Sequence, residues 1–159
     1  MAGFQRPLTI LPCLFVGSCP THADDIDHLK VDYSITAILN LQTDNDFDYW
    51  DLDWSRIESR CNELGIAVRR IPVRAFDPED LRKKLPRCVQ ALDELLRAEH
   101  IVYTQCNVGA GRSPSVAIAY LHWRQGWNLD EAIEHVTKCR SCSPNIDALV
   151  LAGAERVAA

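Results

Sequence analysis

The chain has 159 residues, of which 47% are hydrophobic and 25% charged, and a formal net charge of −5. These values are ordinary for a globular protein with a sizeable core, so we expect residues 1–159 to form a single domain. The acidic balance argues against a general nucleic-acid-binding surface, and we expect no nucleic-acid partner. Because no window reaches the roughly 18 apolar residues of a membrane span, we also expect no membrane partner.

Seven cysteines are scattered through segments that read as core helices and strands. An odd number in such positions is typical of a reducing, intracellular compartment rather than of a disulfide framework. The first residues lack the basic region, apolar run and cleavage site of a secretory signal. We expect a monomer in the cytoplasm, or in a plastid if a transit peptide has been removed.

The first half of the chain alternates between strand and helix patterns. Residues 8–18 (LTILPCLFVGS) are broken by Pro and Gly, which predicts two short strands joined by a turn. Residues 23–33 carry apolar side chains at roughly helical spacing, and residues 34–42 (SITAILNLQ) have the composition of a buried strand. We interpret the acidic segment 44–50 (DNDFDYW) as a loop.

The middle of the chain repeats this alternation. Residues 53–66 have a helical stripe, and residues 66–73 (IAVRRIPV) predict another strand. Residues 80–100 place their apolar side chains on one face, which predicts a long helix that begins near Leu81, with Pro86 near its start rather than in its middle.

The last third delivers a cysteine to the end of a strand. Residues 100–106 (HIVYTQC) form a short apolar run that ends in Cys106, and residues 113–126, 128–139 and 145–159 read as helices. Strands that alternate with helices predict an α/β sandwich, with a mostly parallel central sheet flanked by helices. In such sheets ligands bind beyond the carboxyl ends of the strands, which is where Cys106 lies.

The segment CNVGAGR, residues 106–112, predicts a turn from this strand into a helix that begins near Ser113 and Pro114. Free backbone amides and a helix N-terminus would then surround a space the size of a tetrahedral anion. Small residues suit the close approach of backbone to ligand. We expect a phosphate-binding loop formed by Asn107, Val108, Gly109, Ala110, Gly111, Arg112 and Ser113.

Two residues of this loop carry the chemistry. Arg112 can place a planar fork of donors on two phosphate oxygens and stays charged at any relevant pH. Cys106 at the floor would be surrounded by amides, a helix terminus and the guanidinium, which all favour the nucleophilic thiolate. Ser113 adds a hydroxyl that can stabilise the thiolate when it leaves. Cys106 is therefore the predicted nucleophile.

At this point the chain resembles a known family. Cys-x5-Arg-Ser is the signature of the cysteine-dependent protein tyrosine phosphatase superfamily. The stretch HIVYTQCNVGAGRS is similar to the dual-specificity phosphatase domains of laforin and the plant glucan phosphatases. The stretches LFVGSCP, LNLQTDNDFDYW and DLRKKLP also look like the plant enzymes, so the resemblance covers nearly the whole chain.

The resemblance implies a protein tyrosine phosphatase-like fold and hydrolysis of phosphate monoesters in two steps. Cys106 would attack phosphorus to form a phosphocysteine, which water then opens, while Arg112 and the loop amides stabilise the phosphoryl oxygens. It implies no cofactor and no metal. The single Cys139-x2-Cys142 pair is weak evidence for zinc, and we interpret it as two ordinary thiols.

Two departures from the family pattern matter. Gln105 stands where the family usually has His before the nucleophile, and Ala75 stands where the family has the Asp that protonates the leaving group. General acid catalysis typically contributes about 10²- to 10⁴-fold. Asp77 and Asp80 follow on the same loop, and we take Asp77 as the better substitute acid. The competing interpretation of Asp77 is a cap of the following helix.

The resemblance also bears on the substrate. Tyr49, Trp50 and Phe76 match positions of an aromatic channel that holds glucan in the plant enzymes, which favours a phosphorylated glucan over a phosphoprotein, although Ser143 stands where those enzymes have an aromatic residue. Seven basic and three acidic residues lie between Arg69 and Arg87. They could attract an anionic substrate or simply form a solvated helix face.

Other functions fit the same residues. Loss of the usual acid would permit a catalytically impaired relative that binds phosphate and glucan without turnover. A sulfurtransferase of rhodanese type also surrounds a cysteine with amides, but Arg112 and Ser113 at this spacing fit phosphate better.

Overall fold

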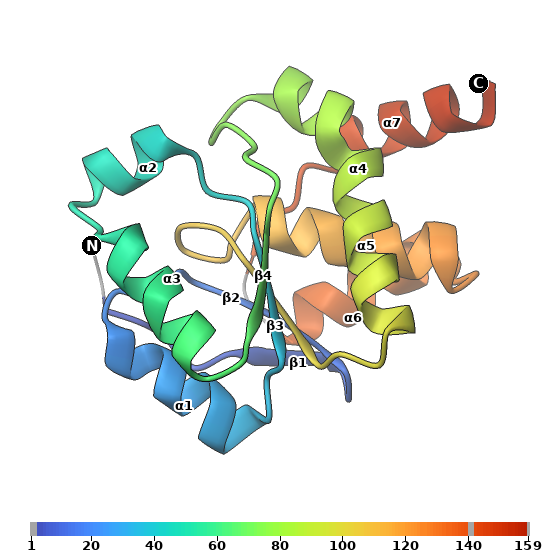
Figure 1. Ribbon diagram of the computed structural model, residues 1–159. Coiled ribbons are helices and arrows are strands. Elements are labelled where there is room, and N and C mark those ends of the chain that lie inside the picture. The colour runs from blue at the N-terminus through green and yellow to red at the C-terminus, as the bar shows by residue number, and fades with distance from the viewer. Residues whose placement is uncertain (1–2, 140–141, 159) are drawn as a thin grey trace.

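The computed structural model describes residues 3–139 and 142–158 (Figure 1). At its centre lies a five-stranded sheet in the order β1-β2-β5-β3-β4. Strand β1 runs antiparallel to β2, and the other neighbouring pairs are parallel. The strands are β1 (Leu8–Leu11), β2 (Leu14–Gly17), β3 (Ala37–Asn40), β4 (Ala67–Arg70) and β5 (Val102–Gln105).

Helices cover both faces of the sheet (Figure 1). Helices α1 (Ala23–Tyr33) and α3 (Trp54–Glu63) pack on one face around a buried cluster that includes Ile38 and Tyr103. The larger cluster on the other face holds side chains of four helices: α4 (Pro78–Arg97), α5 (Arg112–Arg124), α6 (Leu129–Cys139) and α7 (Ile146–Ala158). The predicted α/β sandwich with a mostly parallel sheet is confirmed.

The central strands have apolar sequences because both of their faces are buried. Along β3, Ile38 points into the cluster under α1 and α3, whereas Ala37 and Leu39 point into the cluster under α4 and α5. Asn40 of β3 lies beside Gln105 of β5 in the parallel register. The segments that follow β3, β4 and β5 therefore leave the sheet at the same edge, where the site forms.

The interpretation of residues 44–50 as a loop is wrong. Asp44–Tyr49 form a short helix, α2, and Trp50 is its C-cap. The hydroxyl of Thr43 accepts from the backbone N–H of Asp46, and the carboxylate of Asp46 accepts from the N–H of Thr43. This reciprocal capping supplies partners for otherwise unpaired donors, so it stabilises a helix too short and too acidic to show helical periodicity.

The predicted position of Pro86 is also wrong. Helix α4 begins at Pro78, earlier than the sequence pattern indicated, and Pro86 therefore lies in its interior. Interior proline removes one helical hydrogen bond and typically costs about 3 kcal/mol. Helix α4 nevertheless continues to Arg97 because its apolar face, which includes Leu85 and Leu92, is fully buried. No helix in the described ranges is long and apolar enough to cross a membrane.

We predict that two glycines with similar backbone angles tolerate alanine very differently. Gly126, at φ +74°, has nothing within 4 Å of a Cβ, so Gly126→Ala should lower the free energy of unfolding only by the left-handed conformational cost, about 1–2 kcal/mol. A Cβ on Gly109, at φ +71°, would lie 2.5 Å from the carbonyl carbon of Gly17, so Gly109→Ala should cost clearly more. Urea unfolding of both variants measures the difference, and equal losses would contradict the close packing of the loop against β2.

Candidate active site

Cys106 follows the end of β5 and lies at the floor of a pocket of about 480 Å³. Its side chain is 2% exposed. Its Sγ atom lies 3.2 Å from the Oγ atom of the buried Ser113, in the first turn of α5. A buried thiol that faces a pocket and has a hydroxyl beside it is suited to attack a bound group, and to be stabilised when it leaves.

The backbone of the following loop turns its carbonyl groups outward. The carbonyl of Asn107 accepts from the N–H of Cys19 at 3.0 Å, and that of Ala110 accepts from the N–H of Ser143 at 2.7 Å. The N–H groups from Gly109 to Arg112 have no acceptor within the described ranges, and Gly111 caps α5 without a side-chain hydrogen bond. Such amides at a helix N-terminus form a binding site for a tetrahedral anion.

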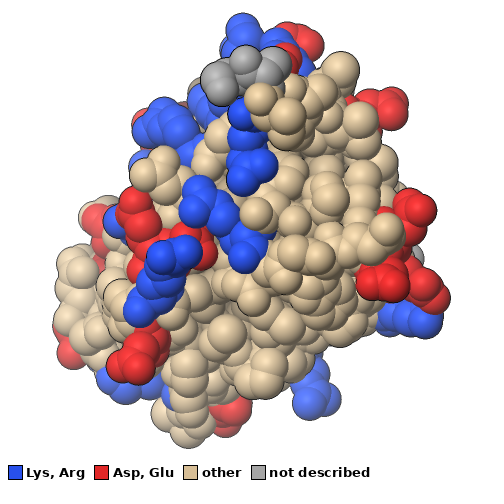
Figure 2. All heavy atoms as spheres, turned by 90° about the vertical axis from the view of Figure 1, so that its right-hand side faces the viewer, with Lys and Arg blue, Asp and Glu red and all other residues tan. Residues whose placement is uncertain are grey.

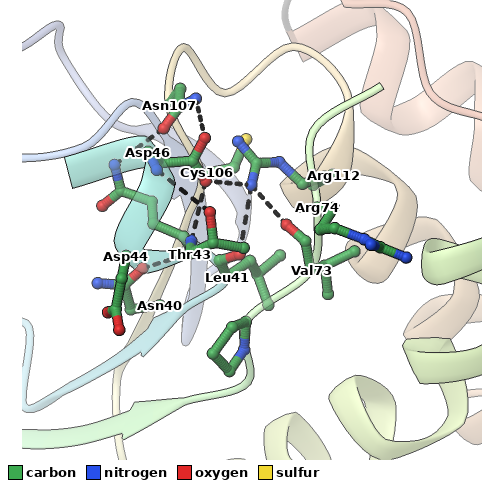
Figure 3. Close-up of polar contacts among 12 residues, drawn as sticks. Asn40, Leu41, Thr43, Asp44, Asp46, Val73, Arg74, Cys106, Asn107 and Arg112 are labelled. Carbon is green, nitrogen blue, oxygen red and sulfur yellow. Dashed lines mark hydrogen bonds and ion pairs between the residues drawn. The ribbon is translucent and has the colours of Figure 1, made fainter. Parts of the chain in front are cut away.

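The guanidinium of Arg112 is held by three acceptors, and all three contact its Nη1 atom. These are a carboxylate oxygen of Asp46 at 2.8 Å, the carbonyl of Val73 at 2.7 Å and the carbonyl of Leu41 at 3.4 Å (Figure 3). The Nε and Nη2 atoms have no acceptor among the described residues, and Arg112 lines the pocket with Cys106. The guanidinium is therefore fixed in direction, with donors left for a ligand.

Asp46 is the buried carboxylate that fixes both the arginine and the loop. Its Oδ2 atom accepts from Arg112 and from the N–H of Thr43, and its Oδ1 atom accepts from Nδ2 of Asn107 at 2.9 Å (Figure 3). Burial alone would raise the pKa of Asp46, but the hydrogen bonds from Arg112, Thr43 and Asn107 outweigh it and hold that pKa below its usual value. Asp46 is therefore ionised at neutral pH.

The predicted acid loop borders the pocket, and Ala75, Phe76 and Asp77 all line it. Asp77 is the N-cap of α4: one carboxylate oxygen accepts from the N–H of Asp80 at 3.0 Å, and the other lies 3.2 Å from Nε of Arg74. Asp77 therefore caps the helix, as the competing interpretation predicted, and it also lines the pocket, as a general acid must.

Asp80, the other acidic candidate on this loop, does not line the pocket. It is 8% exposed, and it accepts from the backbone N–H of Arg74 at 2.7 Å and from Nζ of Lys84 at 3.1 Å. Burial raises the pKa of Asp80, but these two donors outweigh it and lower that pKa. Asp80 therefore holds the loop in place as an ionised carboxylate.

Two of the three predicted aromatic residues line the pocket. Trp50 and Phe76 line it together with Leu81 and Val108, so much of the lining is apolar. Phe76 is fully exposed and adopts φ +56°, a strained conformation for a bulky residue and one typical of functional loops. Tyr49 lies outside the lining, and its ring packs edge-on against Trp50 at 4.9 Å.

The basic residues from Arg69 to Arg87 do not form a broad cationic surface. Five of them form ion pairs: Arg69 with Glu94, Arg70 with Asp44, Arg74 with Asp77, Arg82 with Glu79, and Lys84 with Asp80. On the side where α4 to α7 lie, Figure 2 shows a line of basic side chains with acidic side chains beside part of it. A solvated surface whose basic side chains pair with neighbouring carboxylates is therefore a better interpretation than a region that attracts an anionic substrate.

The remaining thiols differ from Cys106 in their surroundings. All seven cysteines lie within the described ranges, and no disulfide joins them. Burial raises the pKa of Cys19 to about 11, and that of Cys61 and Cys88 to about 12, so these thiols are inert at neutral pH. Within the described residues no group of three or more His, Cys, Asp or Glu side chains could hold a metal ion.

Two important residues were missed by sequence reasoning. Asp46 holds Arg112, and Gln42 hydrogen-bonds to both Gln105 and Asn107. The pattern Thr43-x-x-Asp46 directly after a buried strand is a capping signal and could have revealed α2. No sequence signal shows that Asp46 also reaches Arg112, 66 residues away.

The catalytic-domain model of the dual specificity phosphatases matches residues 14–150. The chain is 37% identical over 87% of its length to phosphoglucan phosphatase LSF1 of Arabidopsis thaliana, and 30% identical over 92% to laforin of Mus musculus. It spans only 23% and 47% of those two proteins. The crystal structure of PTPMT1 superimposes with a TM-score of 0.74 at 20% identity, covering 96% of this chain and 99% of that one.

The structural match shows the fold, and the family model spans the strand, loop and helix that carry Cys106 and Arg112. The relatives agree with the resemblance that the loop sequence indicated. The chain therefore belongs to the dual-specificity phosphatase family.

Proposed function

We propose that the protein hydrolyses phosphate monoesters through a phosphocysteine intermediate. The thiolate of Cys106 attacks phosphorus, and the bond from phosphorus to the leaving oxygen breaks as that oxygen takes up a proton. A water molecule then attacks the phosphocysteine, the bond between sulfur and phosphorus breaks, and the thiolate returns with Ser113 beside it. Inorganic phosphate leaves the pocket.

The observation that carries this proposal is the fixed geometry of Arg112 over the loop. Its Nη1 atom is saturated by Asp46, Val73 and Leu41, so its remaining donors keep one direction before and after substrate binds. Donors that need no reorganisation stabilise charge most effectively in a transition state. With the inward amides of the loop, Arg112 would bind the equatorial oxygens of the transferring phosphoryl group.

The proposed substrate is a phosphorylated glucan. Trp50 and Phe76 border the pocket with flat rings, and such rings stack on the apolar faces of sugars. One relative is named a phosphoglucan phosphatase, which supports this choice. A phosphoprotein is the alternative substrate, and the exposed Ser143 leaves one wall without an aromatic side chain.

A second candidate function follows from the acid loop. Ala75 carries no proton, and both carboxylate oxygens of Asp77 are engaged by the helix cap and by Arg74. A chain without an effective acid would bind phosphorylated glucan and release phosphate slowly or not at all. In this candidate function, the loop still binds phosphate and Trp50 and Phe76 still bind glucan, but phosphate is not released at a useful rate.

The first prediction compares two leaving groups. The protein should release phosphate from p-nitrophenyl phosphate, whose leaving group needs little protonation, and from phosphorylated glucan; Cys106→Ser should abolish both. Phosphate release measured with a colorimetric assay decides. No release from the aryl phosphate by the unaltered chain would contradict the phosphatase proposal, and release from the aryl phosphate alone would favour the second candidate.

A second prediction concerns Asp77. Asn is as good an N-cap as Asp, so Asp77→Asn should leave the melting temperature unchanged. If Asp77 is the acid, the substitution should lower kcat on phosphorylated glucan by about 10²- to 10⁴-fold, with a much smaller loss on p-nitrophenyl phosphate. Equal glucan rates and equal pH–rate profiles in the two proteins would remove Asp77 from the mechanism.

A third prediction concerns the pH dependence of stability. The pKa of Asp46 is lowered in the folded protein, so its contribution is fully present above the unfolded pKa of about 3.9 and is lost as the pH falls through the lower folded pKa. The difference in unfolding free energy between wild type and Asp46→Asn should therefore be largest near neutral pH and shrink below about pH 4. Denaturant unfolding across this range measures it, and a constant difference would contradict the assignment.

A further inference from the structure

A chain of side-chain hydrogen bonds passes behind the phosphate loop. Nε2 of Gln105 donates to Oε1 of Gln42 at 2.9 Å, and Nε2 of Gln42 donates to Oδ1 of Asn107 at 2.9 Å. Nδ2 of Asn107 donates to Oδ1 of Asp46 at 2.9 Å. Because Arg112 contacts the other oxygen of Asp46, the chain joins the residue before the nucleophile to the phosphate-binding arginine.

The direction of this chain is set at its charged end. An ionised carboxylate only accepts hydrogen bonds, so Asn107 must turn its NH₂ group toward Asp46 and its oxygen toward Gln42. Gln42 must then donate to Asn107 and accept from Gln105. Reversing any one amide would place two acceptors or two donors against each other.

Burial makes the chain costly to break. Gln42 is 1% exposed and Gln105 is fully buried. A buried amide that loses its partner costs about 1–3 kcal/mol. The Oε1 atom of Gln105 lacks a donor among the described residues, so the orientation of the chain is fixed at the Asp46 end and not at the Gln105 end.

We propose that Gln42 is a positioning residue for the phosphate loop. By donating to Asn107, it fixes the first side chain after the nucleophile and, through it, the carboxylate that holds Arg112. The loop amides and Arg112 are then in position before phosphate binds. This inference rests on the proposed function only in requiring that the loop binds a tetrahedral oxoanion.

The groups that face this chain are few. Cys19, on the segment after β2, contacts Gln42, and its thiol stays neutral because burial raises its pKa to about 11. Arg70 of β4 donates to the backbone carbonyl of Gln42 at 3.0 Å. Asp46, Arg112 and Cys106 are further titratable or charged groups beside this chain, and Arg74 and Asp77 also line the pocket. The amides of Gln42 and Gln105 themselves do not titrate.

The first test removes the hydrogen bonds of Gln42 but keeps its size. Gln42→Met should raise the Kd for tungstate, a tetrahedral oxoanion, by about tenfold or more, and lower kcat/KM on p-nitrophenyl phosphate. Gln90→Met is the matched control, because Gln90 is exposed on α4 and its side chain bonds to no described residue other than Glu94. Isothermal titration calorimetry measures Kd. A Kd within twofold of wild type in a folded Gln42→Met variant would overturn the proposal.

The second test separates positioning from general damage to the fold. In Gln42→Glu, the protonated carboxyl can still donate to Asn107, whereas the ionised carboxylate can only accept and would face another acceptor. The ratio of variant to wild-type tungstate Kd, taken at equal pH between about 5 and 9, should therefore rise with pH as the introduced carboxyl ionises. Taking the ratio at equal pH removes the pH effects that the two proteins share. A ratio that does not change with pH would overturn the proposal.

Failure of this inference can be distinguished from failure of the proposed function. Tungstate binding requires no turnover, so a chain that binds tungstate with the expected ratios but releases no phosphate supports the role of Gln42 and overturns the phosphatase proposal. A wild-type chain that binds no tungstate would overturn both.

Discussion

The site depends on one buried anion. The carboxylate of Asp46 is nearly inaccessible to water, so it needs donors from the protein, and it takes them from three residues: one in the segment after β3 and two in the loop after β5. The three donors are the backbone N–H of Thr43, which is the N-cap of α2, the side-chain amide of Asn107 in the loop after β5, and the guanidinium of Arg112 at the start of α5. Satisfying this single charge therefore assembles the phosphate-binding side of the pocket.

The sheet brings these segments together. Strands β3, β4 and β5 are parallel and adjacent, so the chain leaves all three at one edge. The segment after β3 carries Gln42 and Asp46, the segment after β4 carries the acid loop, and the segment after β5 carries Cys106. The apolar clusters on both faces hold the strands rigidly, so the polar segments that follow the carboxyl ends of the strands start from fixed positions.

The loop that carries Cys106 and the loop proposed to carry the acid are built very differently. Cys106, Arg112 and Ser113 are buried, and the side chains of Arg112 and Asn107 are each held by more than one hydrogen bond. The acid loop is exposed, carries a strained and solvent-facing Phe76, and contains a carboxylate already engaged as a helix cap. Under the proposed function, the groups that would stabilise the phosphoryl group are therefore prepared in advance, whereas proton transfer by Asp77 would require that carboxylate to release its contact with Arg74.

The sequence by itself determined most of the helices and strands, and the family to which the loop motif belongs. Apolar runs and helical stripes are local patterns, and Cys106, the small residues and Arg112 lie within one short segment whose geometry follows from a strand that turns into a helix. Tertiary structure decided what holds that loop. Gln42 and Asp46 are distant in sequence and carry ordinary polar side chains, so only the parallel register could place them behind Asn107 and Arg112. The interior position of Pro86 and the capped helix α2 were likewise decided by burial and capping, which local periodicity does not record.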